Sequence, residues 1–221
     1  MPQRALSQHR PWLLVAVIAA IAYYVLKDGA LGGLWVMLIK GSAAGALALY
    51  ALMRGPGGDA KILTLFLGIS ALGDMGVNYQ LELGGAIFFV AHLAALTLFL
   101  KNPRPATSGS QKGLAAVLLL GTPLISWLIS GDWQVAVYSV ALGGMAASAW
   151  MSRFPRYRVG IGAVLFVISD WLIFAQMGVL EGSALPEWLV WPFYFAAQFL
   201  IATGVVQTLR GEHPETAKMP T

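Results

Sequence analysis

The chain has 221 residues, of which 58% are hydrophobic and only 11% charged, and its formal net charge is +4. Soluble globular domains carry about 25% charged residues, so this composition excludes an ordinary soluble domain. The chain has no cysteine, which excludes disulfides, thiolate nucleophiles and cysteine-based metal or iron–sulfur sites.

Apolar segments follow one another along the chain, and the short connections between them are rich in glycine and proline. A membrane-spanning helix needs roughly 20 mostly apolar residues. The sequence therefore predicts an all-α integral membrane bundle of eight transmembrane helices in one membrane domain, followed by a disordered polar tail at 211–221. The predicted spans are 11–27, 33–53, 60–79, 83–101, 113–130, 133–152, 157–178 and 188–209.

The first predicted span also has features of a secretory signal peptide. Arg4 and Arg10 precede its apolar run, and Ala-Ile-Ala at 20–22 resembles a small-residue cleavage site. The apolar run continues beyond that site through Leu26 and ends at Lys27, as a spanning helix would. This continuation favours a retained helix over a cleaved leader.

Basic residues follow a pattern set by the connections. With eight spans, both termini and every second connection share one side of the membrane, and Lys27 is the sole basic residue of the connections on the other side. Cytoplasmic loops carry an excess of lysine and arginine, so both termini are predicted to lie in the cytoplasm and the chain in the inner cell membrane. Topology thus accounts for the positive charge, and nucleic acid is not expected as a partner. The cytoplasmic set is Arg4, Arg10, Arg54, Lys61, Lys101, Arg104, Lys112, Arg153, Arg156, Arg158, Arg210 and Lys218.

Two aspartates lie inside predicted spans, Asp74 in the third and Asp170 in the seventh. An ionisable side chain within the bilayer is costly, usually faces the protein interior and usually has a function. The alternative is that each acid only joins helices, but such hydrogen bonds contribute about 0.6 kcal/mol on average. We therefore interpret Asp74 and Asp170 as the candidate catalytic residues.

Further polar residues lie at similar depth, as judged from the helical rise of about 1.5 Å per residue. They fall near the midplane or in the non-cytoplasmic half, and several share one helix face with aromatic residues at i, i+4 spacing. This pattern predicts a polar pocket with aromatic walls that opens toward the non-cytoplasmic side. The candidate substrate-binding residues are Lys40, Asn78, His92, Tyr138, Ser169 and Gln198.

The two halves of the sequence resemble each other in short motifs. Asp74 in the third span corresponds to Ser169-Asp170 in the seventh, and Phe88-x-x-x-His92 in the fourth corresponds to Tyr194-x-x-x-Gln198 in the eighth. This similarity suggests two parallel four-helix repeats joined by the polar stretch at 101–110.

Several chemistries are excluded by the residues present. His92 is the one histidine within the predicted spans, so a three-histidine zinc site cannot form there, and no metal or organic cofactor is expected. The nucleophile elbow and the phosphate-binding Gly-x-x-x-x-Gly-Lys motif are both missing. Two carboxyl groups in one pocket can divide the roles of proton donor and ionised partner. Hydrolysis of an acid-labile ether fits this residue set.

The same residues resemble a known family, the lysoplasmalogenases or YhhN-like membrane proteins. The resemblance extends over nearly the whole chain and rests on Lys40, Gly73-Asp74, Phe88-x-x-x-His92 and the Phe-Val-Ile-Ser-Asp motif that ends at Asp170. It implies hydrolysis of the vinyl ether of a lysoplasmalogen to a fatty aldehyde and glycerophosphoethanolamine or glycerophosphocholine, with the two aspartates as acid–base residues. A lysophospholipid substrate and the lipid bilayer are the implied partners. Some members have proline after the lysine, where this chain has Gly41.

Two other classes of function remain open at this point. A small-molecule or proton-coupled transporter would also use intramembrane charges and repeats, and it requires a polar path through both leaflets. A non-catalytic lipid-binding or structural protein predicts that the aspartates point away from one another or toward backbone partners. A pocket that is closed toward the cytoplasm would favour an enzyme.

Overall fold

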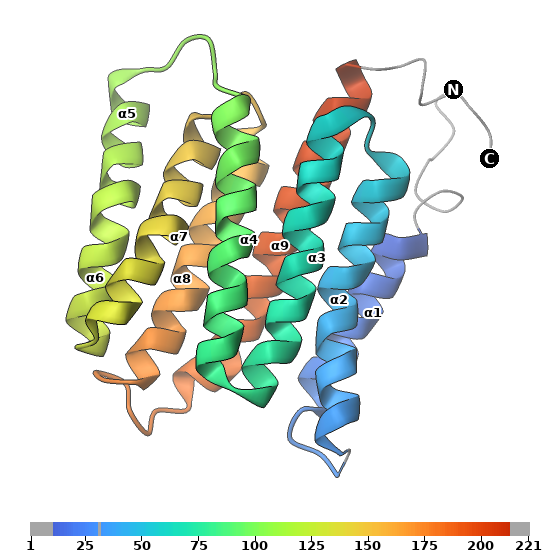
Figure 1. Ribbon diagram of the computed structural model, residues 1–221, viewed down its shortest axis with the longest axis vertical. Helices are drawn as coiled ribbons and strands as arrows, with labels where there is room; N and C mark the ends of the chain where they lie inside the picture. The colour runs from blue at the N-terminus through green and yellow to red at the C-terminus, as the bar shows by residue number, and fades with distance from the viewer. Residues whose placement is uncertain (1–10, 31, 213–221) are drawn as a thin grey trace.

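The computed structural model describes residues 11–30 and 32–212, and these residues form helices joined by short connections, with no β-strand among them. The predicted all-helical fold class is thereby confirmed. The helices run side by side between two ends of the molecule (Figure 1). They are α1 (Pro11–Leu26), α2 (Gly33–Arg54), α3 (Gly57–Tyr79), α4 (Leu81–Lys101), α5 (Gly109–Ala116), α6 (Thr122–Ser130), α7 (Trp133–Met151), α8 (Ile161–Gln176) and α9 (Leu185–Glu212).

Within the described residues, one of two π-helical turns explains why nine labelled helices correspond to eight predicted spans. The turn Val117–Gly121 joins α5 to α6 without interrupting the rod, and the turn Arg156–Gly160 leads directly into α8. Each predicted span therefore corresponds to one continuous rod, with ends that differ by a few residues. The predicted tail began at residue 211, whereas α9 extends through Glu212, and 213–221 lie outside the described residues.

Six of the rods in the described chain are long and apolar enough to cross a membrane. They are Gly33–Arg54, Gly57–Tyr79, Leu81–Lys101, Gly109–Ser130, Arg156–Gln176 and Leu185–Glu212. The remaining two are α1, an apolar helix of 16 residues, and α7, which is 19 residues long. With so many apolar spans, the chain is a multi-pass membrane protein.

The connections gather at two ends of the molecule (Figure 1), and the residues of the two ends differ in charge. We call one the basic end; it holds the connections after α2, α4 and α7 and the end of α9. We call the other the acidic end; it holds the connections after α1, α3, α6 and α8. Its charged residues are Lys27, Asp28, Glu82, Asp132, Glu181 and Glu187.

Glycines bring α3 and α4 into close contact near Asp74. A Cβ added at Gly84 of α4 would lie 2.4 Å from the backbone nitrogen of Val77, and one added at Gly73 would lie 2.9 Å from the Phe88 ring. Small residues at such crossings let helix backbones approach closely in a membrane protein. This packing holds the α3 segment that carries Asp74 directly against α4, which carries His92.

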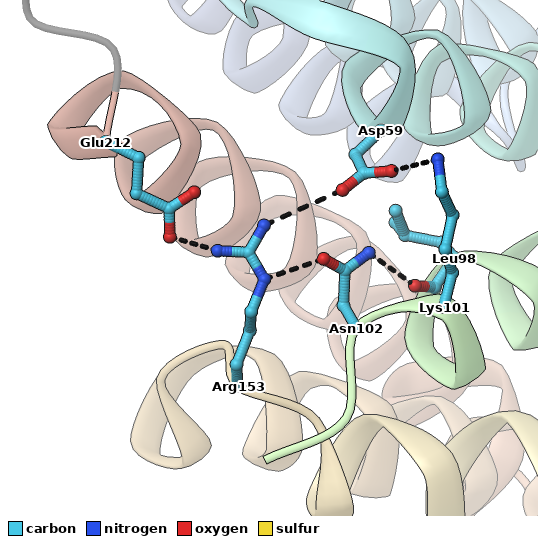
Figure 2. A network of polar contacts seen from close by, with 6 residues as sticks. All are labelled: Asp59, Leu98, Lys101, Asn102, Arg153 and Glu212. Carbon is cyan, nitrogen blue, oxygen red and sulfur yellow. Dashed lines mark hydrogen bonds and ion pairs between the residues drawn. The ribbon is translucent and has the colours of Figure 1, made fainter. Parts of the chain in front are cut away.

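At the basic end, a network of charged and polar side chains connects neighbouring helices (Figure 2). Asp59 of α3 pairs with Lys101 at 2.9 Å and with Arg153 at 3.6 Å. Arg153 also donates to Asn102 Oδ1 at 2.6 Å and pairs with Glu212 in the last turn of α9. The network thus connects α3, the end of α4, the segment after α7 and α9, and it holds the basic end of the bundle together.

Candidate active site

A cavity of about 790 Å³ lies between α1, α2, α3, α4, α7, α8 and α9. Its deep part is lined by Lys40, Asp74, Tyr138 and Asp170, and its outer part by charged residues of the acidic end. This volume lies within the range of about 300–1,000 Å³ that is usual for small-molecule sites. Because its outer residues belong to the acidic end, the cavity opens at that end, which the sequence predicts to lie on the non-cytoplasmic side. The outer charged residues are Lys27, Glu82, Asp132 and Glu187.

Asp74 is almost fully buried, with 2% of its surface exposed, and it is held from α9. The hydroxyl of Tyr194 donates to Asp74 Oδ2 at 2.8 Å, and Gln198 Nε2 donates to the Tyr194 oxygen at 3.0 Å. Lys40 of α2 lies close enough for its positive charge to act on Asp74. Each of these contacts stabilises negative charge on the carboxylate.

Asp170 has a parallel arrangement with different partners. The hydroxyl of Tyr138, from α7, donates to Asp170 Oδ2 at 2.7 Å. His92 Nε2, from α4, lies 2.8 Å from the same hydroxyl and 3.8 Å from Asp170 Oδ2. Three helices thus converge on this carboxyl group.

The two aspartates belong to one site. Both line the same cavity, and the charges of both act on the Tyr194 hydroxyl. In each case the tyrosine engages Oδ2, and Oδ1 accepts no side-chain hydrogen bond from the residues that the structure describes. One oxygen of each carboxyl group therefore remains for a reacting molecule in the cavity.

Lys40 is placed by aromatic rings rather than by a carboxylate contact. Its Nζ lies 5.5 Å from the ring centre of Tyr23 and 6.0 Å from that of Trp191, distances at which a cation is attracted to an aromatic face. Nζ also donates to Asn78 Oδ1 at 3.3 Å. Lys40, Tyr23 and Trp191 all line the cavity, so the ammonium group is available to an anionic ligand.

Aromatic side chains pack against the two tyrosines that donate to the carboxyl groups. Phe88 and Phe166 pack edge-on against Tyr194 with ring centres 5.7 and 5.3 Å apart, and Phe174 packs edge-on against Tyr138 at 5.7 Å. Edge-to-face packing fixes ring orientation beyond what burial alone provides. These contacts hold both tyrosine hydroxyls in place.

The structure brings five of the eight predicted site residues to the cavity: Lys40, Asp74, Tyr138, Ser169 and Asp170. His92 and Gln198 are completely buried behind the two tyrosines and do not line it. Asn78 is exposed near the end of α3 and reaches the site through Lys40. Ser169 Oγ donates to the Val190 carbonyl at 3.1 Å, which ties α8 to α9.

Tyr194 was missing from the predicted site residues, although it contacts Asp74 directly. The sequence contained a signal for it, because Tyr194 lies one helical turn before Gln198 on the same face. The acidic residues at the cavity opening were also missed, since in the sequence they served only as indicators of topology. The structure places these residues at the cavity opening, because the helix ends that carry them surround it.

Comparisons with known proteins agree with the resemblance seen in the sequence. A lysoplasmalogenase from Mycobacterium bovis is 30% identical over 195 residues, which cover 82% of this chain and 74% of the relative. The protein from Mycobacterium tuberculosis with the same name matches equally. Lysoplasmalogenase TMEM86A from Bos taurus is 27% identical over 237 residues, covering 94% of this chain and 93% of the relative.

No solved structure matches the chain. The model of the YhhN family matches residues 35–205, which include every predicted site residue and, at least in part, each described helix from α2 to α9. The chain therefore belongs to the YhhN family.

Proposed function

We propose that this protein is a lysoplasmalogenase-like hydrolase that cleaves the vinyl ether bond of a single-chain ether lysophospholipid. The observation that carries the proposal is the pair of buried carboxyl groups, Asp74 and Asp170, on one aromatic-walled cavity of about 790 Å³. The names of the relatives support the same reaction class.

The reaction needs one group that gives a proton and one that receives a proton. A protonated aspartate gives its proton to the vinyl carbon that bears the alkyl chain, and the π electrons form the new C–H bond. The resulting oxocarbenium ion is stabilised by the ionised aspartate, which then accepts a proton as water adds to the cationic carbon. Collapse of the hemiacetal breaks the bond to the glycerol oxygen, which takes up a proton, and releases the aldehyde and the alcohol.

The remaining cavity residues suit the rest of a lysophospholipid. Lys40 offers an ammonium group to the phosphate, and the aromatic wall around Phe88 and Trp191 offers a surface to the alkenyl chain. Tyr138 and Ser169 line the same space, whereas Asn78, His92 and Gln198 act through Lys40, Tyr138 and Tyr194 respectively. No metal or organic cofactor is needed for these steps.

The positions of the cavity and the charged network favour an enzyme over a transporter. The outer residues of the cavity come from the acidic end, whereas the network of Asp59, Lys101, Arg153 and Glu212 that Figure 2 shows lies at the opposite end. A transporter would need a polar path between the two ends. A purely structural role also fits poorly, because both aspartates accept from side chains that line one cavity.

We also propose that all eight rods span the inner membrane, with both termini in the cytoplasm. The two rods outside the six apolar spans, α1 and α7, lie alongside the others (Figure 1). The concentration of lysine and arginine at the basic end supports a cytoplasmic position for that end.

The deciding experiment incubates the purified protein with a lysoplasmalogen and, separately, with the acyl-ester analogue, and follows products by mass spectrometry. Aldehyde from the vinyl ether and no fatty acid from the ester is the expected result. Asp74→Asn and Asp170→Asn should each abolish aldehyde release while the protein remains folded in detergent. Wild-type protein that releases no aldehyde, or two variants with near-normal turnover, would refute the proposal.

A further inference from the structure

Behind each aspartate lies a second buried polar residue, and the two differ in chemistry. His92 reaches Asp170 through the hydroxyl of Tyr138, with contacts of 2.8 and 2.7 Å. Gln198 reaches Asp74 through the hydroxyl of Tyr194, with contacts of 3.0 and 2.8 Å. An imidazole nitrogen can release and take up a proton, whereas an amide nitrogen only donates a hydrogen bond.

Within the described chain, a proton can reach or leave His92 by a single route. Its side chain is fully buried, it does not line the cavity, and Nδ1 has no hydrogen-bond partner there. The ring is enclosed by Phe88 and Phe166, with ring centres at 6.4 and 4.9 Å. A proton on Nε2 therefore exchanges through Tyr138, and the group that Tyr138 serves is Asp170.

In the described chain, the contacts of Asp74 differ in kind from those of Asp170. Its hydrogen-bond donor is Tyr194, which in turn accepts from an amide that cannot exchange a proton, and the positive charge of Lys40 acts on the same carboxylate. The titratable groups on other helices that lie next to the His92 ring are Tyr138 and Asp170, and the charge of Asp170 also acts on Tyr194. The two carboxyl groups are thus built for different roles.

We propose that His92 and Tyr138 form a proton relay to Asp170, which makes Asp170 the proton donor and Asp74 the ionised partner. This assignment rests on the proposed function. After Asp170 gives its proton to the vinyl carbon, Tyr138 passes its hydroxyl proton to Asp170 and takes the Nε2 proton of the His92 imidazolium. Asp74 accepts the proton of the attacking water and later gives it to the glycerol oxygen. The hemiacetal hydroxyl then gives its proton to Asp170. At the same time, Asp170 passes the proton that it already holds through Tyr138 to His92. His92 is therefore a positioning and relay residue that does not touch the substrate.

The first test does not depend on activity. The chain contains three histidines, His9, His92 and His213, so the full-length protein labelled with ¹⁵N-histidine gives a small set of imidazole signals, and His92→Gln identifies those of His92. We expect Asp170→Asn and Tyr138→Phe to shift the His92 signals and change their pH response, and Asp74→Asn to leave them unchanged. Equal shifts in Asp74→Asn, or no shift in Asp170→Asn, would overturn the relay.

The second test uses kinetics of aldehyde release. Glutamine at position 92 can still donate to Tyr138 but cannot exchange a proton, so we expect kcat to fall about 10- to 100-fold, at or below the lower end of the typical range for acid–base groups. KM should stay unchanged, and the pH profile of kcat should lose one ionisation. A wild-type pH profile in His92→Gln, or a loss confined to KM, would refute the relay. Wild-type protein without aldehyde release would refute the proposed function. The shifts of the His92 ¹⁵N signals in the first test would still decide whether the relay exists.

Discussion

The bond from Tyr194 to Asp74 offers a sharp test of the site, because Tyr194→Phe removes one oxygen and keeps the ring. The ring stays packed against Phe88, Phe166 and Trp191, whereas Asp74 loses the hydroxyl at 2.8 Å. A hydrogen bond to a charged group contributes about 1.5–3 kcal/mol. Since about 1.36 kcal/mol corresponds to a tenfold change in rate, aldehyde release should slow about 10- to 150-fold.

The same substitution leaves the Gln198 amide buried without its acceptor, which should lower the free energy of unfolding by about 1–3 kcal/mol. The assay measures kcat and KM for lysoplasmalogen by mass spectrometry of the aldehyde, together with the thermal midpoint in detergent. Tyr157→Phe is the matched control, because that side chain is 80% exposed. A Tyr194→Phe protein with kcat within twofold of wild type would refute the view that this bond holds a catalytic carboxylate.

Three further predictions concern packing, the basic end and topology. Gly84→Ala should lower the free energy of unfolding by about 1–3 kcal/mol, because the added Cβ would lie 2.4 Å from the Val77 nitrogen, whereas Gly68→Ala on the open face of α3 should not. Arg153→Ala should lower the thermal midpoint by an amount equivalent to about 1 kcal/mol, since its ion pairs are partly exposed, and should leave the kcat of aldehyde release unchanged. In intact cells, an impermeant maleimide should label Glu181→Cys and not Gly109→Cys, because residue 181 lies at the acidic end of the bundle and residue 109 at the basic end. The chain has no native cysteine that would also react.

Each of these predictions has a contrary result that would count against it. Equal stability of the Gly84 and Gly68 variants would show that the α3–α4 crossing is looser than the structure indicates. A large loss of kcat in Arg153→Ala would connect the basic end to the reaction, as a transporter-like mechanism would. Labelling of Gly109→Cys from outside would invert the proposed topology.

The sequence by itself determined the helices and which charged residues lie within them. Hydropathy located each rod to within a few residues, because a membrane span has a nearly fixed length. The cost of a charge in the bilayer singled out Asp74 and Asp170, and helical periodicity placed Tyr194 and Gln198 on one face. The lysine and arginine distribution distinguished the two ends. These properties are local, so they can be derived without knowing which helices are neighbours.

Only the tertiary structure decided which side chains meet. Tyr194 lies 120 positions from Asp74 along the chain, and His92 lies 46 positions from Tyr138. Periodicity gives the face of a helix but not the helix that packs against it, so His92 and Gln198 were expected at the substrate and instead lie behind the tyrosines. Asn78 shares a stripe with Asp74 yet ends at the surface, because α3 reaches the acidic end within a turn of it. Helix packing therefore decides the partners of each aspartate. Asp170 lies beside Tyr138 and His92, whereas Asp74 lies beside Tyr194 and Gln198.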